Sequence, residues 1–133
     1  MNESSTKLDD NARYYWGVDC GSSAIKVVLC DEHGKILHKR KGRTLFPLYQ
    51  HVYDALNDKD FTPFIENGET TKSNHKIVAT GYGRHKLEFV DGKLTEIKAH
   101  FLGIQHQLEL GAPYTIIDIG GQDAKVIAIA HSK

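Results

Sequence analysis

The sequence has no excess of charge of either sign, few cysteines and no long apolar run. Lys plus Arg and Asp plus Glu each number 17, which argues against a nucleic-acid-binding surface and against an acidic tail. No apolar run approaches the ~20 residues that a membrane-spanning helix needs, and the N-terminus lacks the apolar centre of a signal peptide. We therefore expect a soluble, cytoplasmic protein.

The two cysteines, Cys20 and Cys30, are too few for a disulfide framework and too isolated for a metal site. Both lie in apolar stretches with strand character, so we expect two buried thiols. The 133 residues are enough for one domain with its own hydrophobic core.

Two stretches of the chain share one pattern. Residues 14–26, YYWGVDCGSSAIK, and residues 114–125, YTIIDIGGQDAK, each hold an apolar run that ends in Asp, a glycine-containing turn, and a second run that begins near a Lys. Such a turn presents backbone N–H groups that can bind an anionic phosphate. A carboxylate does not bind phosphate directly, so Asp19 and Asp118 require Mg²⁺, or a water to be activated, in between. Two such hairpins facing each other would form a nucleotide clamp.

The first hairpin is followed by a third strand. We expect strands at 15–20, 24–31 and 35–43, with residues 32–34 turning between the last two. Ser22 and Ser23 offer N–H and hydroxyl groups to a phosphate, and Lys26 adds positive charge. The alternative is an ordinary hairpin with a Gly-Ser turn, and this stretch alone leaves both possibilities open.

The middle of the chain is less regular. Residues 1–11 are polar and indicate a disordered leader. A helix is predicted from Pro47, followed by a polar connection over residues 58–74. A short strand at 76–80 then runs into Gly81-Tyr82-Gly83-Arg84, where the glycines permit a sharp turn with close backbone approach. Arg84 could meet a phosphate, a carboxylate or only solvent.

Residues 94–97 could form another short strand or the first turn of a helix. If they form a strand, Glu96 is a carboxylate at a strand end facing the same cleft as Asp19; otherwise it is a solvated Glu. The helix that follows places Ile97, Phe101, Ile104 and Leu108 on one face and stops before Pro113. His100 and His106 lie six residues apart, so a two-histidine metal site on this helix is not expected.

Four segments together carry a resemblance to a known family. GVDCGSSAIKVVL resembles the first phosphate motif of the actin, sugar-kinase and heat-shock-chaperone ATPase superfamily, and IIDIGGQDAKVIAI resembles its second. With ATGYGR and TEIKAHFLG added, the chain is similar to the activator ATPases of 2-hydroxyacyl-CoA dehydratases and benzoyl-CoA reductases, especially the long multi-domain members. The resemblance covers residues 15–129.

The resemblance implies an ATP-driven electron donor. It implies a homodimer with a [4Fe-4S] cluster held between the subunits, in which ATP binding and hydrolysis push a low-potential electron into a partner dehydratase or reductase. Carried over by position, Ser22, Ser23 and Lys26 would contact the β- and γ-phosphates, with Gly21 in the same turn. Asp19 and Asp118 would hold Mg²⁺ through water. Glu96 would be a further catalytic carboxylate if residues 94–97 form a strand. The opposing phosphate loop would contain Gly120, Gly121 and Gln122, supported by Asp123.

The fold that the resemblance implies is α/β, the first lobe of an actin-like (ribonuclease H-like) ATPase. We expect a leader at 1–12, the first lobe at 13–113 and the opening hairpin of a second lobe at 114–133. The lobe would hold a mixed five-stranded sheet with helices on both faces: an antiparallel meander of the first three strands and two parallel strands beside the first. The hairpin at 114–130 would expose unpaired edges and an uncovered apolar face.

Departures from the family pattern limit this interpretation. The cluster cysteines and the adenosine-binding motif of the second lobe are not found in these residues, and Cys20 stands where the family has an aliphatic residue. The chain therefore resembles an N-terminal fragment that would itself be inactive. Two alternatives stay open: a small-molecule kinase of the same superfamily, and a nucleotide-binding or regulatory module without turnover.

Overall fold

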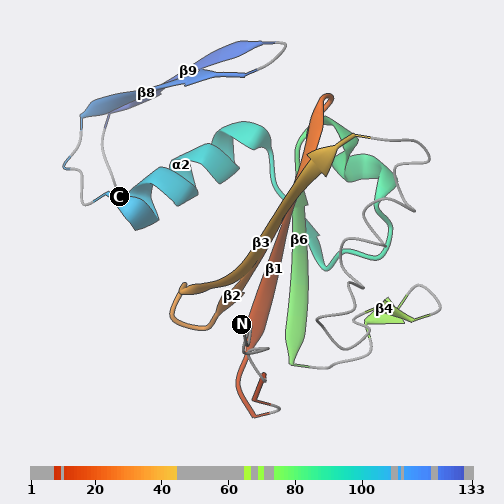
Figure 1. Ribbon diagram of the computed structural model, residues 1–133. Coiled ribbons are helices and arrows are strands. Elements are labelled where there is room, and N and C mark those ends of the chain that lie inside the picture. Colours follow the sequence, from red (N-terminus) through yellow and green to blue (C-terminus); the bar gives the residue numbers. More distant parts are fainter. Residues whose placement is uncertain are drawn as a thin grey trace, which may run out of the picture. The chain divides into compact units, whose positions relative to one another are not determined.

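The computed structural model describes residues 8–9, 11–44, 65–66, 69–70, 74–108, 111, 113–120 and 123–130. The chain divides into two compact units, Met1–Lys93 and Leu94–Lys133, and each is described by itself. Figure 1 shows the elements of both units. The predicted helix from Pro47 and most of the predicted leader lie outside the described residues. Among the described residues, no helix is long and apolar enough to cross a membrane.

The first unit is built on a mixed five-stranded sheet (Figure 1). Its strands β1, β2 and β3 form an antiparallel meander, β6 pairs parallel with β1, and β7 pairs parallel with β6. The strands are β1 (Tyr14–Cys20), β2 (Ala24–Asp31), β3 (Ile36–Arg43), β6 (His75–Thr80) and β7 (Gly92–Lys93), in the order β3-β2-β1-β6-β7. The predicted sheet is confirmed, with Gly92–Lys93 rather than residues 94–97 as its fifth strand.

One face of this sheet forms the core. Side chains of adjacent strands at paired positions point to the same face, and β1 pairs Trp16 with Leu29 on one side and with Ile77 on the other. The alternation of apolar and polar residues therefore places every second side chain of three strands in one layer. The buried residues of this layer are Tyr14, Trp16, Val18, Cys20, Ile25, Val27, Leu29, Ile77, Ala79 and Leu87. Leu8 and Ala12, from the segment predicted to be a leader, pack against it.

A buried hydrogen bond crosses the start of the sheet. The indole Nε1 of Trp16 donates to Nδ1 of His75 at 3.0 Å. His75 is buried, and its ring also lies 5.1 Å from the ring of Tyr14, centroid to centroid. The bond fixes the tautomer of His75, because Nδ1 must lack a proton to accept it. It ties β1 to β6 across a long sequence separation.

The other described elements of the first unit are a short strand pair and a 3₁₀ helix. Strands β4 (Ile65–Glu66) and β5 (Glu69–Thr70) pair with each other in the predicted connection. A 3₁₀ helix, η1 (Tyr82–Lys86), follows β6 and delivers the buried Leu87 to the core.

The second unit contains helix α2 (Glu96–Gln107) and a hairpin of β8 (Tyr114–Ile119) and β9 (Ala124–Ile129). The strand interpretation of residues 94–97 is wrong, because Thr95 is the N-cap of α2 and its hydroxyl accepts from the N–H of Lys98 at 3.3 Å. Glu96 therefore does not end a strand but opens the helix. On the predicted apolar face of α2, Ile97 and Leu108 are exposed in the structure.

The two faces of the β8–β9 hairpin differ in burial. Ile116 and Ile127, which pair with each other, are buried. On the opposite face Ile117, Ile119 and Val126 are 68%, 81% and 71% exposed. Both faces carry apolar side chains, as expected for a strand pair meant to be covered on both sides. The described residues thus agree with the predicted uncovered apolar face.

Candidate phosphate site

The turn between β1 and β2 is closed by a backbone hydrogen bond. The N–H of Gly21 donates to the carbonyl of Ala24 at 3.0 Å. A Cβ at Gly21 would lie 2.7 Å from that carbonyl oxygen, so the turn requires glycine there. Ser22 and Ser23 are exposed at its tip, and among the described residues no hydrogen bond uses their N–H groups. These two amides are therefore available to an anion.

Thr44, directly after β3, holds this turn from outside. Its hydroxyl donates to the carbonyl of Gly21 at 2.7 Å, and its N–H donates to the carbonyl of Ser23 at 3.0 Å. Carbonyl oxygens repel a phosphate. Because the carbonyls of Gly21 and Ser23 both accept hydrogen bonds from Thr44, they are held on the β3 side of the turn. Sequence reasoning missed Thr44, since a Thr after a strand carries no signal by itself.

Asp19 and Lys26 face each other across β1 and β2. They are paired in register, and Nζ of Lys26 lies 3.8 Å from Oδ2 of Asp19. Both side chains keep contact with solvent, so the ion pair contributes little to stability. The lysine and the carboxylate flank the Ser22–Ser23 turn, which brings together the predicted residues of the first hairpin.

Gly81 brings the Gly-Tyr-Gly-Arg motif against the same carboxylate. Its φ is +88°, and a Cβ there would lie 2.6 Å from Oδ1 of Asp19 and 2.6 Å from the carbonyl oxygen of Cys20. The predicted sharp turn with close approach is confirmed. Arg84 folds back so that its Nη1 donates to the carbonyl of Gly81 at 2.9 Å. In this structure Arg84 therefore stabilises the turn.

Thr80 adds a hydroxyl beside Asp19. The two residues are paired in register on β6 and β1, which places their side chains on one face. The Thr80 hydroxyl oxygen is buried and has no hydrogen-bond partner among the described residues. Among the same residues, no three His, Cys, Asp or Glu side chains gather as direct metal ligands. One carboxylate and one hydroxyl fit a hydrated Mg²⁺ held through its waters, because Mg²⁺ keeps several of them.

The second hairpin repeats the geometry of the first. Asp118 pairs with Lys125 in register, as Asp19 pairs with Lys26. The N–H of Gly120 donates to the carbonyl of Asp123 at 2.8 Å, the same closure that Gly21 makes. The predicted sequence similarity is thus a structural one. Gly121 and Gln122 lie outside the described residues.

Lys125 is the centre of a charged cluster in the second unit. Its Nζ lies 3.1 Å from both oxygens of Asp123, 3.6 Å from Oε1 of Glu96 and 4.0 Å from Oδ2 of Asp118. Its side chain is only 17% exposed. The hydrogen bonds that Lys125 donates to the Asp123 carboxylate raise the pKa of Lys125 most, and the nearby charges of Glu96, Asp123 and Asp118 raise it further. The cluster brings together three of the predicted carboxylates, and it also contains His100, which sequence reasoning did not assign to a site.

The two cysteines are unsuited to a shared iron-sulfur ligand set. Both are free thiols; Cys20 is buried in the core layer, whereas Cys30 pairs in register with Tyr15 and points to the opposite face. Burial, with a smaller effect of the Asp19 charge, raises the pKa of Cys20 to about 11. A thiol that is hard to ionise is a poor metal ligand. The expectation of a buried thiol holds for Cys20, and Cys30 is half-buried.

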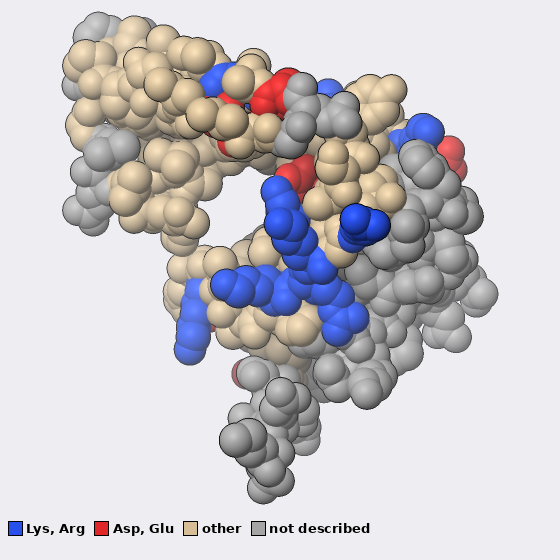
Figure 2. Space-filling view, turned by 45° about the horizontal axis from the view of Figure 1, so that its top comes forward, with Lys and Arg blue, Asp and Glu red and all other residues tan. Residues whose placement is uncertain are grey.

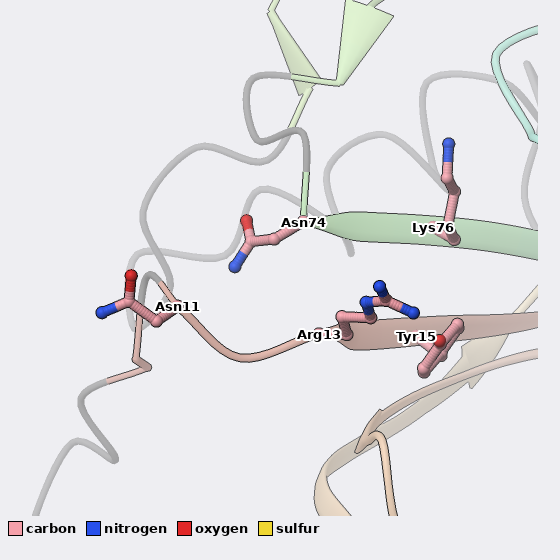
Figure 3. A pocket seen from close by; sticks show the side chains of 5 residues that line it. All are labelled: Asn11, Arg13, Tyr15, Asn74 and Lys76. Carbon is pink, nitrogen blue, oxygen red and sulfur yellow. The ribbon is translucent and has the colours of Figure 1, made fainter.

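Two further surface features lie away from the turns. A pocket at the start of β1 and β6 is lined by Asn11, Arg13, Tyr15, Asn74 and Lys76 (Figure 3). It sits at the other end of these strands from Asp19 and Thr80. Lys and Arg side chains also gather on the face seen in Figure 2. The edge strand β3 carries the exposed residues Lys39, Arg40, Lys41 and Arg43. Such charged side chains protect an edge strand from pairing with another chain.

The chain matches a known protein family over most of its length. Residues 16–133 match the model of the BadF/BadG/BcrA/BcrD ATPase family. The chain is 48% identical over 116 residues to the activator of lactoyl-CoA dehydratase from Anaerotignum propionicum, covering 87% of the chain and 42% of that protein. It is 30% identical over 120 residues to the (R)-2-hydroxyglutaryl-CoA dehydratase activating ATPase of Acidaminococcus fermentans, covering 89% and 43%.

A solved structure of an activator is also similar to this chain. The activator of 2-hydroxyisocaproyl-CoA dehydratase from Clostridium difficile, with bound ADPNP, matches with a TM-score of 0.67 at 30% identity, covering 87% of this chain and 41% of that one. These residues thus have the predicted actin-like ATPase fold. The chain spans about two fifths of the length of the curated relatives it matches.

Proposed function

The chain belongs to the BadF/BadG/BcrA/BcrD ATPase family, and from this we propose that its two hairpins are the two phosphate-binding elements of an ATP site in an activator of a 2-hydroxyacyl-CoA dehydratase. The observation that carries the proposal is the repeated hairpin: the Asp-Lys register and the Gly closure of the first are reproduced in the second. The ADPNP in a relative 30% identical to this chain supports a nucleotide as the ligand.

The geometry of the first hairpin supports the roles that we propose for its residues. The N–H groups of Ser22 and Ser23 receive the β- and γ-phosphates, and Gly21 closes the turn that presents them. Lys26 then exchanges its partner Asp19 for phosphate oxygens, because the distance of 3.8 Å marks a loose ion pair. Asp19, released from the lysine, would hold Mg²⁺ through water, beside the Thr80 hydroxyl with which it pairs in register.

In the second hairpin, Asp118 takes the equivalent role of Asp19. Gly120, Gly121 and Gln122 would be the second phosphate loop, and Asp123 would support it through Lys125. Glu96 belongs to the same charged cluster through its ion pair with Lys125, so its proposed contribution is to the charge around Asp118 rather than as the end of a strand.

The chemistry is phosphoryl transfer to water. Mg²⁺, when bound, neutralises charge that develops on the phosphate oxygens. The chain itself contributes positioned amide dipoles, the Lys26 ammonium and two carboxylates that orient water. Such catalysis rests on positioning and electrostatic stabilisation, because phosphoryl transfer leaves the protein little covalent work.

Beyond ATP hydrolysis, we propose that the protein drives electron transfer to a partner enzyme. ATP turnover in a homodimer would drive a low-potential electron from a [4Fe-4S] cluster into a dehydratase or reductase partner in the cytoplasm. The described residues do not supply the cluster ligands, because Cys20 and Cys30 point to opposite faces of the sheet. Residues 1–133 alone would bind nucleotide weakly and would not turn it over.

A chimera tests the proposal. Residues 1–133 are joined to the part of the Anaerotignum propionicum activator that the match does not cover, and ATP hydrolysis and ATP-dependent activation of lactoyl-CoA dehydratase are measured anaerobically. The proposal expects both activities, and loss of both in Asp118→Ala. Hydrolysis without activation favours the kinase alternative. Tight nucleotide binding without hydrolysis favours the regulatory alternative, and no binding at all contradicts an ATP site.

A further inference from the structure

The pocket at the start of β1 and β6 is a cavity of about 460 Å³ on the sheet face opposite the core (Figure 3). Tyr15 on β1 pairs in register with Lys76 on β6, and both alternate with buried neighbours. Arg13 and Asn74 stand two residues before them, so the same alternation places them on this face. In Figure 3 the Arg13 guanidinium lies between the two segments. A cavity of this size is typical of small-molecule sites.

The rim of the pocket is held by hydrogen bonds. The side-chain amide of Asn74 donates to the carbonyl of Ala12 at 2.7 Å, and the N–H of Tyr14 donates to the backbone carbonyl of Asn74 at 3.0 Å. The N–H of Asn11 donates to Oδ1 of Asp9 at 2.9 Å. The segment before β1 is therefore tied to the segment before β6. A site formed in advance in this way loses less conformational entropy when a ligand binds.

The lining of the pocket carries positive charge. It contains two cations, Arg13 and Lys76, and none of its described residues is acidic. The side chain of Arg13 forms no ion pair or hydrogen bond within the part of the chain that the structure describes. Nζ of Lys76 lies 3.6 Å from Oδ1 of Asp91, with side chains 59% and 35% exposed, so this ion pair is weak. Lys76 can therefore exchange Asp91 for another anion.

The donors of the lining suit an anion with two negative charges. A guanidinium binds two oxygens of a carboxylate or phosphate side by side, and an ammonium adds a second point charge. Asn11 brings an amide and Tyr15 a phenol hydroxyl, and both groups can donate to further oxygens. The Tyr15 ring, 39% exposed, offers an apolar surface next to these donors. Phosphate monoesters and dicarboxylates share the charge and the oxygens that this lining requires.

The pocket is separate from the turn between β1 and β2. Tyr15 and Asp19 lie on the same face of β1 but four residues apart, which corresponds to about 13 Å along a strand. One phosphate group cannot reach both places. A ligand in the pocket is therefore distinct from a phosphate bound at Ser22 and Ser23.

We propose that this pocket is a second anion site, in which Arg13 and Lys76 bind a small dianion, either a phosphate monoester or a dicarboxylate. Binding replaces the Lys76–Asp91 ion pair with contacts to the ligand. The proposal does not depend on the nucleotide site, because none of the lining residues is assigned to the nucleotide.

The test is a titration of the ¹⁵N-labelled 133-residue chain with glycerol phosphate, succinate or chloride at equal ionic strength and about pH 8. A phosphate monoester is a dianion there, because its second pKa is about 6. The amides of Tyr15 and Lys76 should shift and saturate with at least one dianion and not with chloride. Saturation with glycerol phosphate alone identifies a phosphate ester as the ligand class, and saturation with succinate alone identifies a dicarboxylate. No saturable shift with either dianion overturns the proposal.

Two variants show whether the binding belongs to the pocket. Arg13→Gln should weaken binding by about tenfold, as is usual when a hydrogen bond to a charged group is lost, while its urea midpoint stays that of wild type because Arg13 is exposed. Lys39→Gln removes an exposed cation of β3 that does not line the pocket, and it should bind like wild type. Undiminished binding of both dianions by Arg13→Gln overturns the proposal. Shifts of Ser22 and Ser23 report on the proposed nucleotide site instead, so the two proposals fail separately.

Discussion

Gly81 and Asp19 are in such close contact that no side chain fits between them. A Cβ on Gly81 would lie 2.6 Å from Oδ1 of Asp19, and the backbone of Gly81 has φ +88° and ψ 174°, a region that side chains disfavour. The Gly-Tyr-Gly-Arg motif is therefore tied to the β1–β2 hairpin by steric fit. It shapes the surroundings of Asp19 without contributing a charge to it.

Gly81→Ala should damage both stability and the site. The strained backbone alone costs about 1–3 kcal/mol, and the new methyl group must push Asp19 or the Cys20 carbonyl aside. We expect a lower midpoint of urea unfolding. The fluorescence of Trp16, the only tryptophan in the sequence, measures it.

The matched control is Gly103→Ala. Gly103 lies inside α2, and nothing lies within 4 Å of a Cβ built there. This substitution should stabilise the helix by about 0.5–1 kcal/mol. A Gly81→Ala variant as stable as wild type would show that the close contact with Asp19 is not a constraint.

Trp16→Phe should cost about 1–3 kcal/mol, because the donor to Nδ1 of His75 is removed from a buried site. Replacing both partners, as Trp16→Phe with His75→Leu, should recover part of that loss, since apolar groups at both positions leave no acceptor behind. Urea unfolding followed by circular dichroism measures the four members of the cycle. Strict additivity of the two single changes would contradict a coupling through this bond.

Thr44→Val should loosen the first phosphate turn. It removes the hydroxyl that donates to Gly21 at 2.7 Å, at a cost of about 1 kcal/mol, while the valine keeps the shape and the N–H bond to Ser23. Thr44→Ser should restore the bond. We expect faster hydrogen exchange of the Gly21 and Thr44 amides, which donate to the carbonyls of Ala24 and Ser23, in the valine variant only. Equal exchange in both variants would mean that the hydroxyl does not hold the turn.

Alkaline solution should destabilise the first unit through Cys20. Burial raises the pKa of this thiol from 9.0 to about 11, so the native state keeps a proton that the unfolded chain releases. The stability contribution is fully present below pH 9 and is lost as the pH rises through 11, by about 3 kcal/mol at ~1.4 kcal/mol per pKa unit. Urea midpoints of wild type and Cys20→Ala should therefore converge across this range. A constant difference would contradict the shift.

The amino-acid pattern predicted much of the sheet in the first unit, because neighbouring residues determine its strands and turns. Alternation along β1 and β2 sets the buried face, and the turn closed by Gly21 sets the register that pairs Asp19 with Lys26. Residues 94–97 could not be assigned from so short an apolar run; the Thr95 cap, a side-chain hydrogen bond, decides for helix. Thr44 and His100 were missed for a related reason. Each acts on a segment distant in sequence, through a contact that only the tertiary structure creates.

The most direct test of the account is a titration of the ¹⁵N-labelled chain with magnesium ADP, observed at the backbone amides. The account predicts that Ser22, Ser23 and Gly120 shift together and saturate, and that Lys26→Gln weakens the response, whereas Lys39→Gln on the exposed edge strand does not. Shifts confined to other residues, or an undiminished response in Lys26→Gln, would contradict the claim that the two hairpins bind phosphate.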